Sequence, residues 1–358
     1  MKIGIFDPYL DSLSGGEKYM LSIAACLASY HEIFIFWDLR QEAEIKQRAY
    51  KKLGIDISKV RFVENIFSSD VSFVSRVKAS QKYDLIIYLS DGSIPFLWSK
   101  LYIHFQFPVE WVKGNSIKTI FKLKRVGKIF CNSFFTKNYI DKKFNVQSMV
   151  LYPPVIIKEK RLGKEDVILH VGRFGINTEG SNYKKQDVLI KVFKKMVDSG
   201  LRGWRFTLII GVGKVDKDNL EQLKKIAKGY PISIIENPSN DFLWEQYTKA
   251  KIYWHASGFG EDLEKHPEKA EHFGISTVEA MGAGVVPVVI NAGGQREIVE
   301  DGKNGFLWNT QDELIEKTNE LIQNTKLWKE MSKAAIQRTQ VFGGIDRFCR
   351  ELKALVLE

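Results

Sequence analysis

Two glutamates, Glu271 and Glu279, stand with seven residues between them in a stretch whose residue types could bind hydroxyl groups. Carboxylates accept two or more hydrogen bonds each, so such a pair can hold several hydroxyls of one ligand. Residues 275–283 have helical spacing, which places Glu271 before a helix and Glu279 inside it. Free N–H groups at a helix start bind anions, and here they would belong to Phe273, Gly274 and Ile275. A solvated helix face can show the same spacing, so the pair alone does not decide function.

Two cations, Arg173 and Lys184, could do the complementary chemistry of binding phosphate. Arg173 follows an apolar run of strand type, and Lys184 comes just before a predicted helix. Both can therefore reach one edge of a sheet and stabilise the negative charge that develops on a diphosphate leaving group. The alternative is a pair of ordinary surface cations. The neighbouring Lys185 is expected to face solvent.

Glycine and histidine mark two further candidate positions in the first half of the chain. Gly15 and Gly16 follow the first predicted strand and open a helix, where they permit close backbone approach to a phosphate or a sugar. A turn before a helix also uses glycine for its own sake. A dinucleotide site would need G-x-G-x-x-G directly after the strand, and that spacing is absent. His104 ends the run LYIHF, where a lone histidine is ordinarily a structural group.

The run EHFGISTVEAMGAGVVPVVINAGGQREIV resembles the signature of family 4 retaining glycosyltransferases. The resemblance extends to a Gly-Gly loop, to a histidine, and to a Gly-Arg followed by Lys-Gly-x-x-x-Leu. The matching positions are Gly15, Gly16, His104, Gly172, Arg173, Lys184 and Leu189. The chain departs from the pattern at Lys185, which replaces a glycine, and in a longer loop between Arg173 and Lys184.

The resemblance implies that a hexose, of the mannose or glucose type, moves from a nucleoside-diphosphate sugar to a hydroxyl of a glycan or lipid-linked acceptor. Glu279 would hold the nucleotide ribose, and Glu271 would face the donor sugar. Arg173 and Lys184 would hold the diphosphate, and His104 would lie beneath the sugar. No metal and no cofactor other than the donor substrate is expected.

Strands and helices alternate along the whole chain, which predicts an α/β protein with parallel sheets covered by helices on both faces. Predicted strands cover 2–6, 32–37, 60–63, 85–89, 101–105, 128–131, 148–151, 167–171, 206–211, 232–236, 251–255 and 286–290. Predicted helices cover 17–29, 41–53, 71–79, 115–126, 136–142, 186–199, 218–228, 241–250 and 275–283. Proline pairs interrupt such elements, so Pro153 and Pro154 mark a domain boundary.

The predicted domains are a Rossmann-like acceptor-side domain over 1–152 and a Rossmann-like donor domain over 153–340. The segment 341–358 is predicted to be a helix that packs back towards the first domain. Two such sheets facing each other across a cleft is the GT-B architecture, which the resemblance also implies. The polar insertion 258–269 could be a lid over the donor site or a surface excursion.

Composition bounds the class of protein and its partners. Hydrophobic residues make up 44% of the 358 residues and charged residues 27%, as in a soluble globular protein. The three cysteines are widely spaced, which predicts buried free thiols in a reducing compartment. No apolar stretch is long enough to cross a bilayer and no signal peptide is evident, so a cytoplasmic location is expected.

A formal net charge of +10 favours an anionic partner. The segment Lys113–Lys128 predicts a basic amphipathic helix that could place the protein peripherally on the cytoplasmic membrane face, although a solvated helix packed on its own sheet has the same pattern. Nucleic acid is not expected as a partner. Two other functions stay open: a nucleotide-sugar epimerase of the same fold, and a non-enzymatic polyanion binder.

Overall fold

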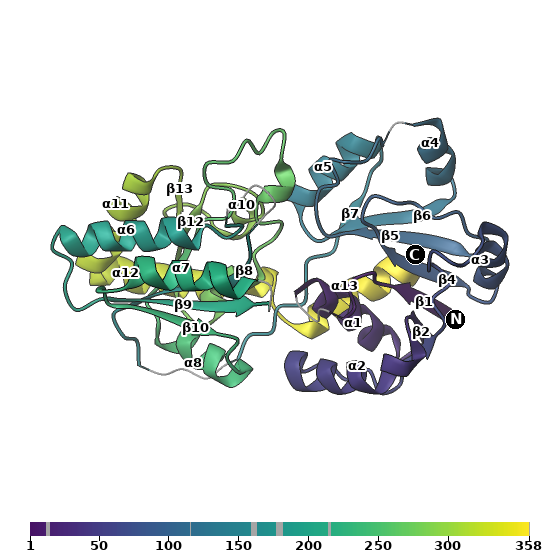
Figure 1. The fold of residues 1–358 in the computed structure, drawn as a ribbon, viewed down its shortest axis with the longest axis horizontal. Coiled ribbons are helices and arrows are strands. Elements are labelled where there is room, and N and C mark those ends of the chain that lie inside the picture. Colours follow the sequence, from purple (N-terminus) through teal and green to yellow (C-terminus); the bar gives the residue numbers. More distant parts are fainter. Residues whose placement is uncertain (12–14, 115, 159–162, 177–181, 214–215, 358) are drawn as a thin grey trace. The chain divides into compact units, whose positions relative to one another are not determined.

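The structure, a computed structural model, describes residues 1–358 except 12–14, 115, 159–162, 177–181, 214–215 and 358. The chain forms two compact units. Met1–Pro154 and Gly344–Glu358 make the amino-terminal unit, and Val155–Gly343 makes the carboxyl-terminal unit. Each unit contains one parallel sheet flanked by helices (Figure 1).

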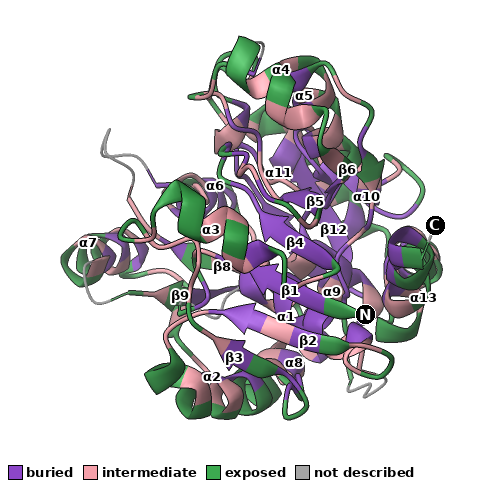
Figure 2. Ribbon diagram, turned by 90° about the vertical axis from the view of Figure 1, so that its right-hand side faces the viewer, coloured by how far each residue is buried: buried purple, intermediate pink, exposed green. Residues whose placement is uncertain are grey.

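The sheet of the amino-terminal unit has, among the described residues, seven parallel strands in the order β3-β2-β1-β4-β5-β6-β7. The strands are β1 (Lys2–Phe6), β2 (Glu32–Phe36), β3 (Arg61–Val63), β4 (Leu85–Leu89), β5 (Lys100–Phe105), β6 (Val126–Cys131) and β7 (Met149–Val150). The helices are α1 (Gly15–Leu27), α2 (Glu42–Arg48), α3 (Phe73–Ser80), α4 (Ile117–Leu123), α5 (Phe134–Phe144) and α13 (Ile345–Leu357). Strand β4, with the sequence LIIYL, is buried at every position because helices or loops cover both faces of the sheet, and Figure 2 shows this burial along the central strands.

The carboxyl-terminal unit repeats the same architecture, with its described strands in the order β10-β9-β8-β11-β12-β13. The strands are β8 (Val167–Phe174), β9 (Arg205–Val212), β10 (Ile232–Glu236), β11 (Ile252–His255), β12 (Val286–Ile290) and β13 (Phe306–Trp308). The helices are α6 (Gln186–Asp198), α7 (Lys217–Ala227), α8 (Asn240–Lys249), α9 (Ile275–Gly282), α10 (Gln295–Ile298), α11 (Gln311–Gln323) and α12 (Thr325–Arg338). The strand order reverses between β8 and β11, which places a topological switch point at these two strands.

The predicted fold class is confirmed, since both units are parallel-sheet, Rossmann-like domains. Four predicted strands (2–6, 85–89, 232–236 and 286–290) have the predicted bounds. The predicted helix 41–53 divides into a 3-10 turn (Leu39–Gln41), α2 and a π-helical turn (Ala49–Leu53). Within the described ranges, no helix is both long and apolar enough to cross a membrane.

The predicted basic helix over Lys113–Lys128 is wrong in its extent. Helix α4 begins after Ser116, whose side chain accepts a hydrogen bond from the Thr119 backbone, and ends at Leu123. From Val126 the chain pairs with β5 as strand β6, because the central strand offers an open ladder of backbone groups there. Lys128 therefore lies on a strand, where its ammonium donates to the Leu355 carbonyl oxygen at 2.8 Å.

The prediction of three free thiols is also wrong. Cys26 of α1 and Cys349 of α13 form a disulfide, with their Cα atoms 5.4 Å apart. The two cysteines are 323 residues apart in sequence, so their spacing gave no sign that α13 packs on α1. Cys131 is a buried free cysteine. The disulfide removes the support that free thiols gave to a reducing compartment.

Candidate functional site

The carboxyl ends of β8 and β11 bring the candidate residues of the carboxyl-terminal unit to one edge of its sheet. Strand β11 is buried at every position and β8 over its first four residues, and the two pair in parallel, with Ile252 beside Ile168. Strand β8 carries Arg173 next to its last residue, and β11 ends at His255. In doubly wound sheets ligands bind at this edge, beside the switch point.

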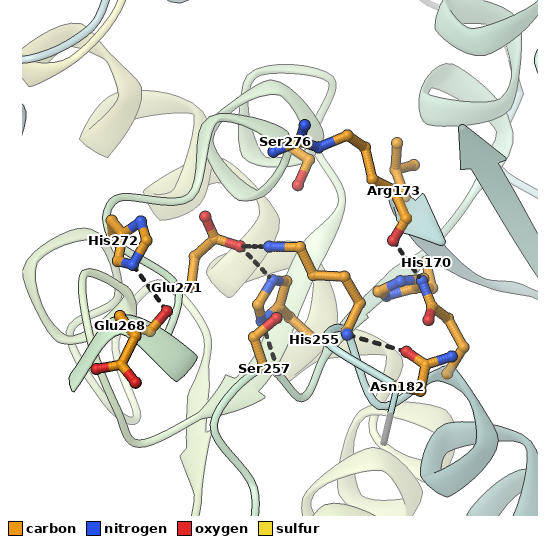
Figure 3. A network of polar contacts seen from close by, with 12 residues as sticks. His170, Arg173, Asn182, His255, Ser257, Glu268, Glu271, His272 and Ser276 are labelled. Carbon is orange, nitrogen blue, oxygen red and sulfur yellow. Dashed lines mark hydrogen bonds and ion pairs between the residues drawn. The ribbon is translucent and has the colours of Figure 1, made fainter. Parts of the chain in front are cut away.

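Glu271 occupies the centre of this edge and is held by two side chains from different elements (Figure 3). Its Oε2 atom lies 2.6 Å from the Lys184 ammonium and 2.9 Å from Nε2 of His255. The carboxylate is 18% exposed. Partial burial opposes its ionisation, but Lys184 and His255 outweigh burial and hold the pKa of Glu271 well below its usual range. The group is therefore a carboxylate at neutral pH that can accept further hydrogen bonds.

The backbone of Glu271 is held by the turn at Gly293 and Gly294. The Gly294 N–H donates to the Glu271 carbonyl oxygen at 2.8 Å. A Cβ atom on Gly293 would lie 2.2 Å from that same oxygen, and Gly293 has a φ of +59°. Only glycine allows the two segments to approach this closely, so this pair shapes the loop that presents Glu271.

Glu279 lies one helix further on, in α9, and contacts a different partner. The hydroxyl of Tyr247, a fully buried residue of α8, donates to Oε2 of Glu279 at 3.1 Å. Burial first, and then the Glu279 carboxylate, raise the pKa of Tyr247 well above its usual range, so the phenol stays a donor. The two glutamates are thus positioned independently and can bind different parts of a ligand.

The start of α9 has free backbone N–H groups, as predicted, but the side chain of Phe273 packs in the protein interior. Gly274 precedes the helix with a φ of +119°, and no side chain caps the first turn. The Ser276 hydroxyl lies 2.7 Å from that of Tyr253. Phe273 is buried and packs against Phe342 with ring centroids 5.7 Å apart. Of Phe273, only the backbone is positioned for a ligand.

Arg173 and Lys184 come to the same edge, but they are held differently. Lys184 is paired with Glu271, and its backbone N–H donates to the Asn182 side chain at 2.9 Å. Arg173 is exposed, and Figure 3 shows its side chain extending from β8 towards Ser276. The Arg173 carbonyl oxygen accepts from the Gln186 side chain at 3.1 Å, which fixes the end of β8 against α6.

Three histidines surround these cations, and sequence reasoning assigned no role to them. Burial lowers the pKa of His170 to about 3 and that of His272 to about 4. Burial also lowers the pKa of His255, and the positive charge of Lys184 acts in the same direction on all three rings. The imidazoles are neutral at pH 7. The positive charge available for an anion therefore resides on Arg173 and Lys184.

Several buried polar atoms at this edge have no hydrogen-bond partner in the part of the chain that the structure describes. They are Nε2 of His170, Nδ2 of Asn182, Oε1 of Gln186 and Oγ of Ser257. A buried polar atom without a partner typically costs about 1–3 kcal/mol, so such a group of atoms indicates a place where a ligand or water completes the structure.

The candidate residues of the amino-terminal unit are placed by α1 and β5. Gly15 and Gly16 begin α1, while Ser14 lies outside the described residues. The Gln106 amide donates to the Gly16 carbonyl oxygen at 3.0 Å, and a Cβ on Gly16 would lie 2.5 Å from Oε1 of Gln106. The Gln106 side chain would have to move to admit a side chain at this position.

His104 is 0% exposed and lies stacked between the rings of Tyr19 and Phe130. Its Nδ1 atom is 3.1 Å from the Phe130 carbonyl oxygen. Burial lowers the pKa of His104 to about 3, so the ring is neutral. In this structure the imidazole is part of the core of its unit.

Asp7 is a further buried carboxyl group that sequence reasoning missed. It follows β1 directly and is 1% exposed. Burial, and then the nearby Glu17 carboxylate, raise the pKa of Asp7 to about 7. Its position at the carboxyl end of β1, where the order of that sheet reverses, is the signal that could have found it.

Comparisons with known proteins agree with this architecture. A family model described as glycosyl transferases group 1 matches residues 155–338, just over half of the chain. The chain is 26% identical to the GDP-Man:Man(3)GlcNAc(2)-PP-Dol alpha-1,2-mannosyltransferase of Dictyostelium discoideum over 286 residues, which are 68% of this chain and 53% of that protein. It is 22% identical to the alpha-1,3/1,6-mannosyltransferase ALG2 of the same organism, over 99% of this chain and 98% of that one. The chain spans about half the length, or less, of several curated relatives that it matches, the alpha-1,2-mannosyltransferase among them.

Solved structures show the same fold. Anabaena Alr3699/HepE, in complex with UDP and glucose, is similar with a TM-score of 0.74 and 16% identity, over 99% of both chains. The apo form of the lipopolysaccharide outer core galactosyltransferase WaaB is similar with a TM-score of 0.69 and 16% identity, again over 99% of both. The resemblance inferred from the sequence motifs is thereby confirmed at the level of family and fold.

Proposed function

This chain belongs to the family of group 1 glycosyl transferases, and we propose that it moves a hexose, with retention of configuration, from a nucleoside-diphosphate sugar to a hydroxyl of a glycan or lipid-linked acceptor. The observation that carries the proposal is the Glu271 carboxylate, held between Lys184 and His255 at the switch point of a doubly wound sheet. An ionised carboxylate beside a cation is suited to bind sugar hydroxyls next to a diphosphate.

In the proposed complex, each donor group meets the chemistry that fits it. Arg173 and Lys184 neutralise the diphosphate, and the uncapped first turn of α9 adds backbone N–H groups. Glu279, positioned by Tyr247, accepts hydrogen bonds from the ribose. Glu271 accepts hydrogen bonds from the hexose. Lys184 then shares its ammonium between Glu271 and the phosphate, which places sugar and leaving group next to each other.

The proposed reaction breaks the bond between the anomeric carbon and the β-phosphate oxygen. The acceptor oxygen forms the new bond to the same carbon on the same face, and the acceptor proton goes to the departing phosphate. Glu271 remains a positioning carboxylate in this scheme, because its lowered pKa keeps it ionised and ion-paired. The positive charge of Arg173 and Lys184 stabilises the diphosphate as it leaves, so we propose that no metal ion is required.

The amino-terminal candidates have narrower proposed roles. We propose that Gly16 lets the start of α1 approach the donor, since a glycine at the beginning of a helix permits close approach of the backbone to a ligand. His104 stays neutral and buried, so we propose that it supports the end of β5 without exchanging protons.

A mannose donor is favoured over glucose on two grounds. The run EHFGISTVE resembles lipid-linked mannosyltransferases, and two of the similar curated proteins are named as mannosyltransferases, one of them with a PP-Dol-linked glycan in its name. The name of the first of these relatives also supports the proposed glycan or lipid-linked acceptor.

Helix α4 supplies the proposed contact with the cytoplasmic face of a membrane. Its apolar side chains point to solvent, with Ile117 87% and Phe121 61% exposed. Lys118 and Lys124 are exposed beside them. Exposed apolar groups among lysines fit an anionic lipid surface, where the apolar groups enter the interface and the lysines meet the head groups.

The proposal is tested by incubating the purified protein with GDP-mannose and with UDP-glucose and measuring release of the nucleoside diphosphate. We expect release with at least one donor, in the presence of EDTA as in its absence. Glu279→Ala and Lys184→Ala should each lose on the order of 100-fold in kcat/KM, as expected for the removal of one charged contact to donor or leaving group. The assignment fails if the wild type binds neither donor or if both variants keep full activity.

The same assay separates the two alternatives. An epimerase would convert the nucleotide sugar without releasing the diphosphate. A polyanion binder would show salt-sensitive binding that survives Glu279→Ala.

A further inference from the structure

Lys185 adopts a backbone conformation that is unusual for a residue with a side chain. It immediately precedes α6 with φ 54° and ψ 35°, in the left-handed region. A Cβ atom disfavours this conformation, which glycine adopts freely. Strain of this kind persists where other contacts over-determine it. Contacts with other parts of the chain must therefore hold Lys185 in this conformation.

These contacts come from the insertion 258–269. The Lys185 ammonium forms an ion pair with Glu261, which also pairs with Lys269 at 3.1 Å. The side chains of Lys185, Glu261 and Lys269 are 13%, 14% and 16% exposed. We call these three residues the Lys185 ion cluster. Burial opposes ionisation of Glu261, but hydrogen bonds from Lys185 and Lys269 outweigh it and lower the pKa of Glu261. The prediction that Lys185 faces solvent is therefore wrong.

The insertion is folded against its own unit rather than projecting from it. Phe259 packs on Trp308 with ring centroids 5.3 Å apart, and Leu263 contacts the hydrophobic core. The Glu261 N–H donates to the Gly258 carbonyl oxygen at 3.2 Å, and Pro267 is buried. Glu261 is thus presented to Lys185 by an ordered loop.

The two ends of this insertion join the candidate site. His255 precedes it and Glu271 follows it, and these two side chains contact each other. Consecutive lysines at the start of α6 then contact the loop at two points, Lys184 at Glu271 and Lys185 at Glu261. An ion pair this sheltered is lost only at considerable cost, because its partners are left charged and poorly solvated.

We propose that Lys185 is a positioning residue: through Glu261 it fixes the insertion 258–269, and thereby sets the place of Glu271 against the sugar of the donor. The kinetic part of this inference rests on the proposed function. The sugar-binding step should depend on the Lys185 ion cluster, whereas binding of the nucleoside diphosphate, through Arg173, Lys184 and Glu279, should not.

The test uses Lys185→Met, which keeps a long unbranched side chain, together with Glu261→Gln and the double variant. We expect backbone amides in 258–274 to exchange hydrogen about tenfold faster in each single variant. We expect kcat/KM for the active donor, GDP-mannose or UDP-glucose, to fall about tenfold, with the Kd of GDP or UDP unchanged. The effects should not add in the double variant, since both substitutions break one interaction.

A glycine substitution distinguishes the effect of the strained backbone from the effect of the ion pair. Lys185→Gly relieves the left-handed conformation but removes the ion pair, so it should keep the melting temperature near that of the wild type and still loosen the insertion. Asn145→Gly is the matched control, because Asn145 is an exposed left-handed residue, φ 51°, that ends α5 in the other unit. It should leave both exchange and kinetics unaltered.

The outcomes are decisive in either direction. Unaltered exchange in Lys185→Met and Glu261→Gln overturns the positioning role, as does faster exchange with wild-type kcat/KM, or an equal loss of GDP or UDP affinity. If the wild type uses neither donor, the proposed function fails by itself. Exchange in the peptide that contains Glu271 then still decides whether Lys185 fixes it.

Discussion

Two acidic residues at the carboxyl edges of the two sheets show how environment decides protonation. Glu271 faces Lys184 and His255, and its pKa is held well below the usual range despite partial burial. Asp7 is more deeply buried and has Glu17 nearby, so its pKa is raised to about 7. One group is an obligate anion at neutral pH, whereas the other changes charge there. The same residue class at equivalent places in a repeated architecture therefore differs in chemistry.

The raised pKa of Asp7 predicts a specific pH dependence of stability. Folding favours its protonated form, so its contribution is fully present below the ordinary aspartate pKa near 4 and is lost as the pH rises through 7. With a folded-state pKa of about 7, this loss is at most about 4 kcal/mol. Asp7→Asn should remove it, making the variant more stable than the wild type at pH 8 but not at pH 4, as measured by urea unfolding.

Glu271→Gln should show the opposite pH dependence of stability in the same urea experiment. The lowered pKa of Glu271 gives stability that is present above the ordinary glutamate pKa and is lost as the pH falls through the folded-state value. The variant should therefore be less stable than the wild type at pH 7, and the difference should shrink in acid. If Asp7→Asn and the wild type show parallel pH curves, Asp7 is not the titrating group.

At the scale of elements, helix α13 illustrates how a remote segment completes a domain. It follows the whole carboxyl-terminal unit in sequence yet packs on α1, and the disulfide between Cys26 and Cys349 joins the two. Its buried residues Phe348, Leu352 and Leu355 belong to the core of the amino-terminal unit. A cross-link between segments so distant in sequence restricts the unfolded chain strongly.

Removal of this disulfide should destabilise the amino-terminal unit by about 2–4 kcal/mol. Cys26→Ser should lower the free energy of unfolding in urea by that amount under oxidising conditions. Dithiothreitol should bring the wild type to the level of the variant and leave the variant unaltered. Cys131→Ser, which removes the buried free thiol, should keep the sensitivity to dithiothreitol. Equal stability of wild type and Cys26→Ser in the absence of reductant would contradict the expectation.

The elements and the fold class could be predicted because alternating buried strands and amphipathic helices leave a local pattern. What could not be predicted is which side chains meet over long separations in sequence. Glu261 comes from an insertion whose fold leaves no periodic signal, so Lys185 looked like a solvent-facing lysine. Helix α4 was predicted too long because the pairing of Val126 with β5 is decided by the sheet and not by local propensity.

At the candidate site, motif resemblance located Glu271, Glu279, Arg173 and Lys184, but it did not predict what holds them. The contact between Lys184 and Glu271 spans 87 residues in sequence, and the strand order of the sheet creates it. His255 was overlooked because a histidine within an apolar strand carries no local sign of its partner. Motifs therefore supplied candidate residues, whereas topology supplied the contacts that hold Lys184 and Glu271.

At the scale of the whole molecule, the formal net charge of +10 can act in two ways. The positive charge as a whole can attract any polyanion within about a Debye length. Alternatively, attraction can depend on basic residues that lie beside exposed apolar groups, which add a short-range contact. Ile117 and Phe121 on α4 are exposed among lysines, which favours the second. Lys228, which directly follows α7 (Lys217–Ala227), is an exposed lysine with no exposed apolar residue in that helix.

Two charge reversals distinguish these possibilities, because each replaces one positive charge with one negative charge and so alters the net charge equally. A basic residue near an anionic surface contributes about 1 kcal/mol. Lys118→Glu should therefore weaken co-sedimentation with phosphatidylglycerol vesicles roughly 10- to 30-fold, while Lys228→Glu should change it by no more than about twofold. Phe121→Ser should weaken vesicle binding even in high salt, because salt screens the electrostatic attraction but not the burial of the ring. Equal weakening by the two reversals would mean that the net charge, and not α4, governs attraction to the membrane.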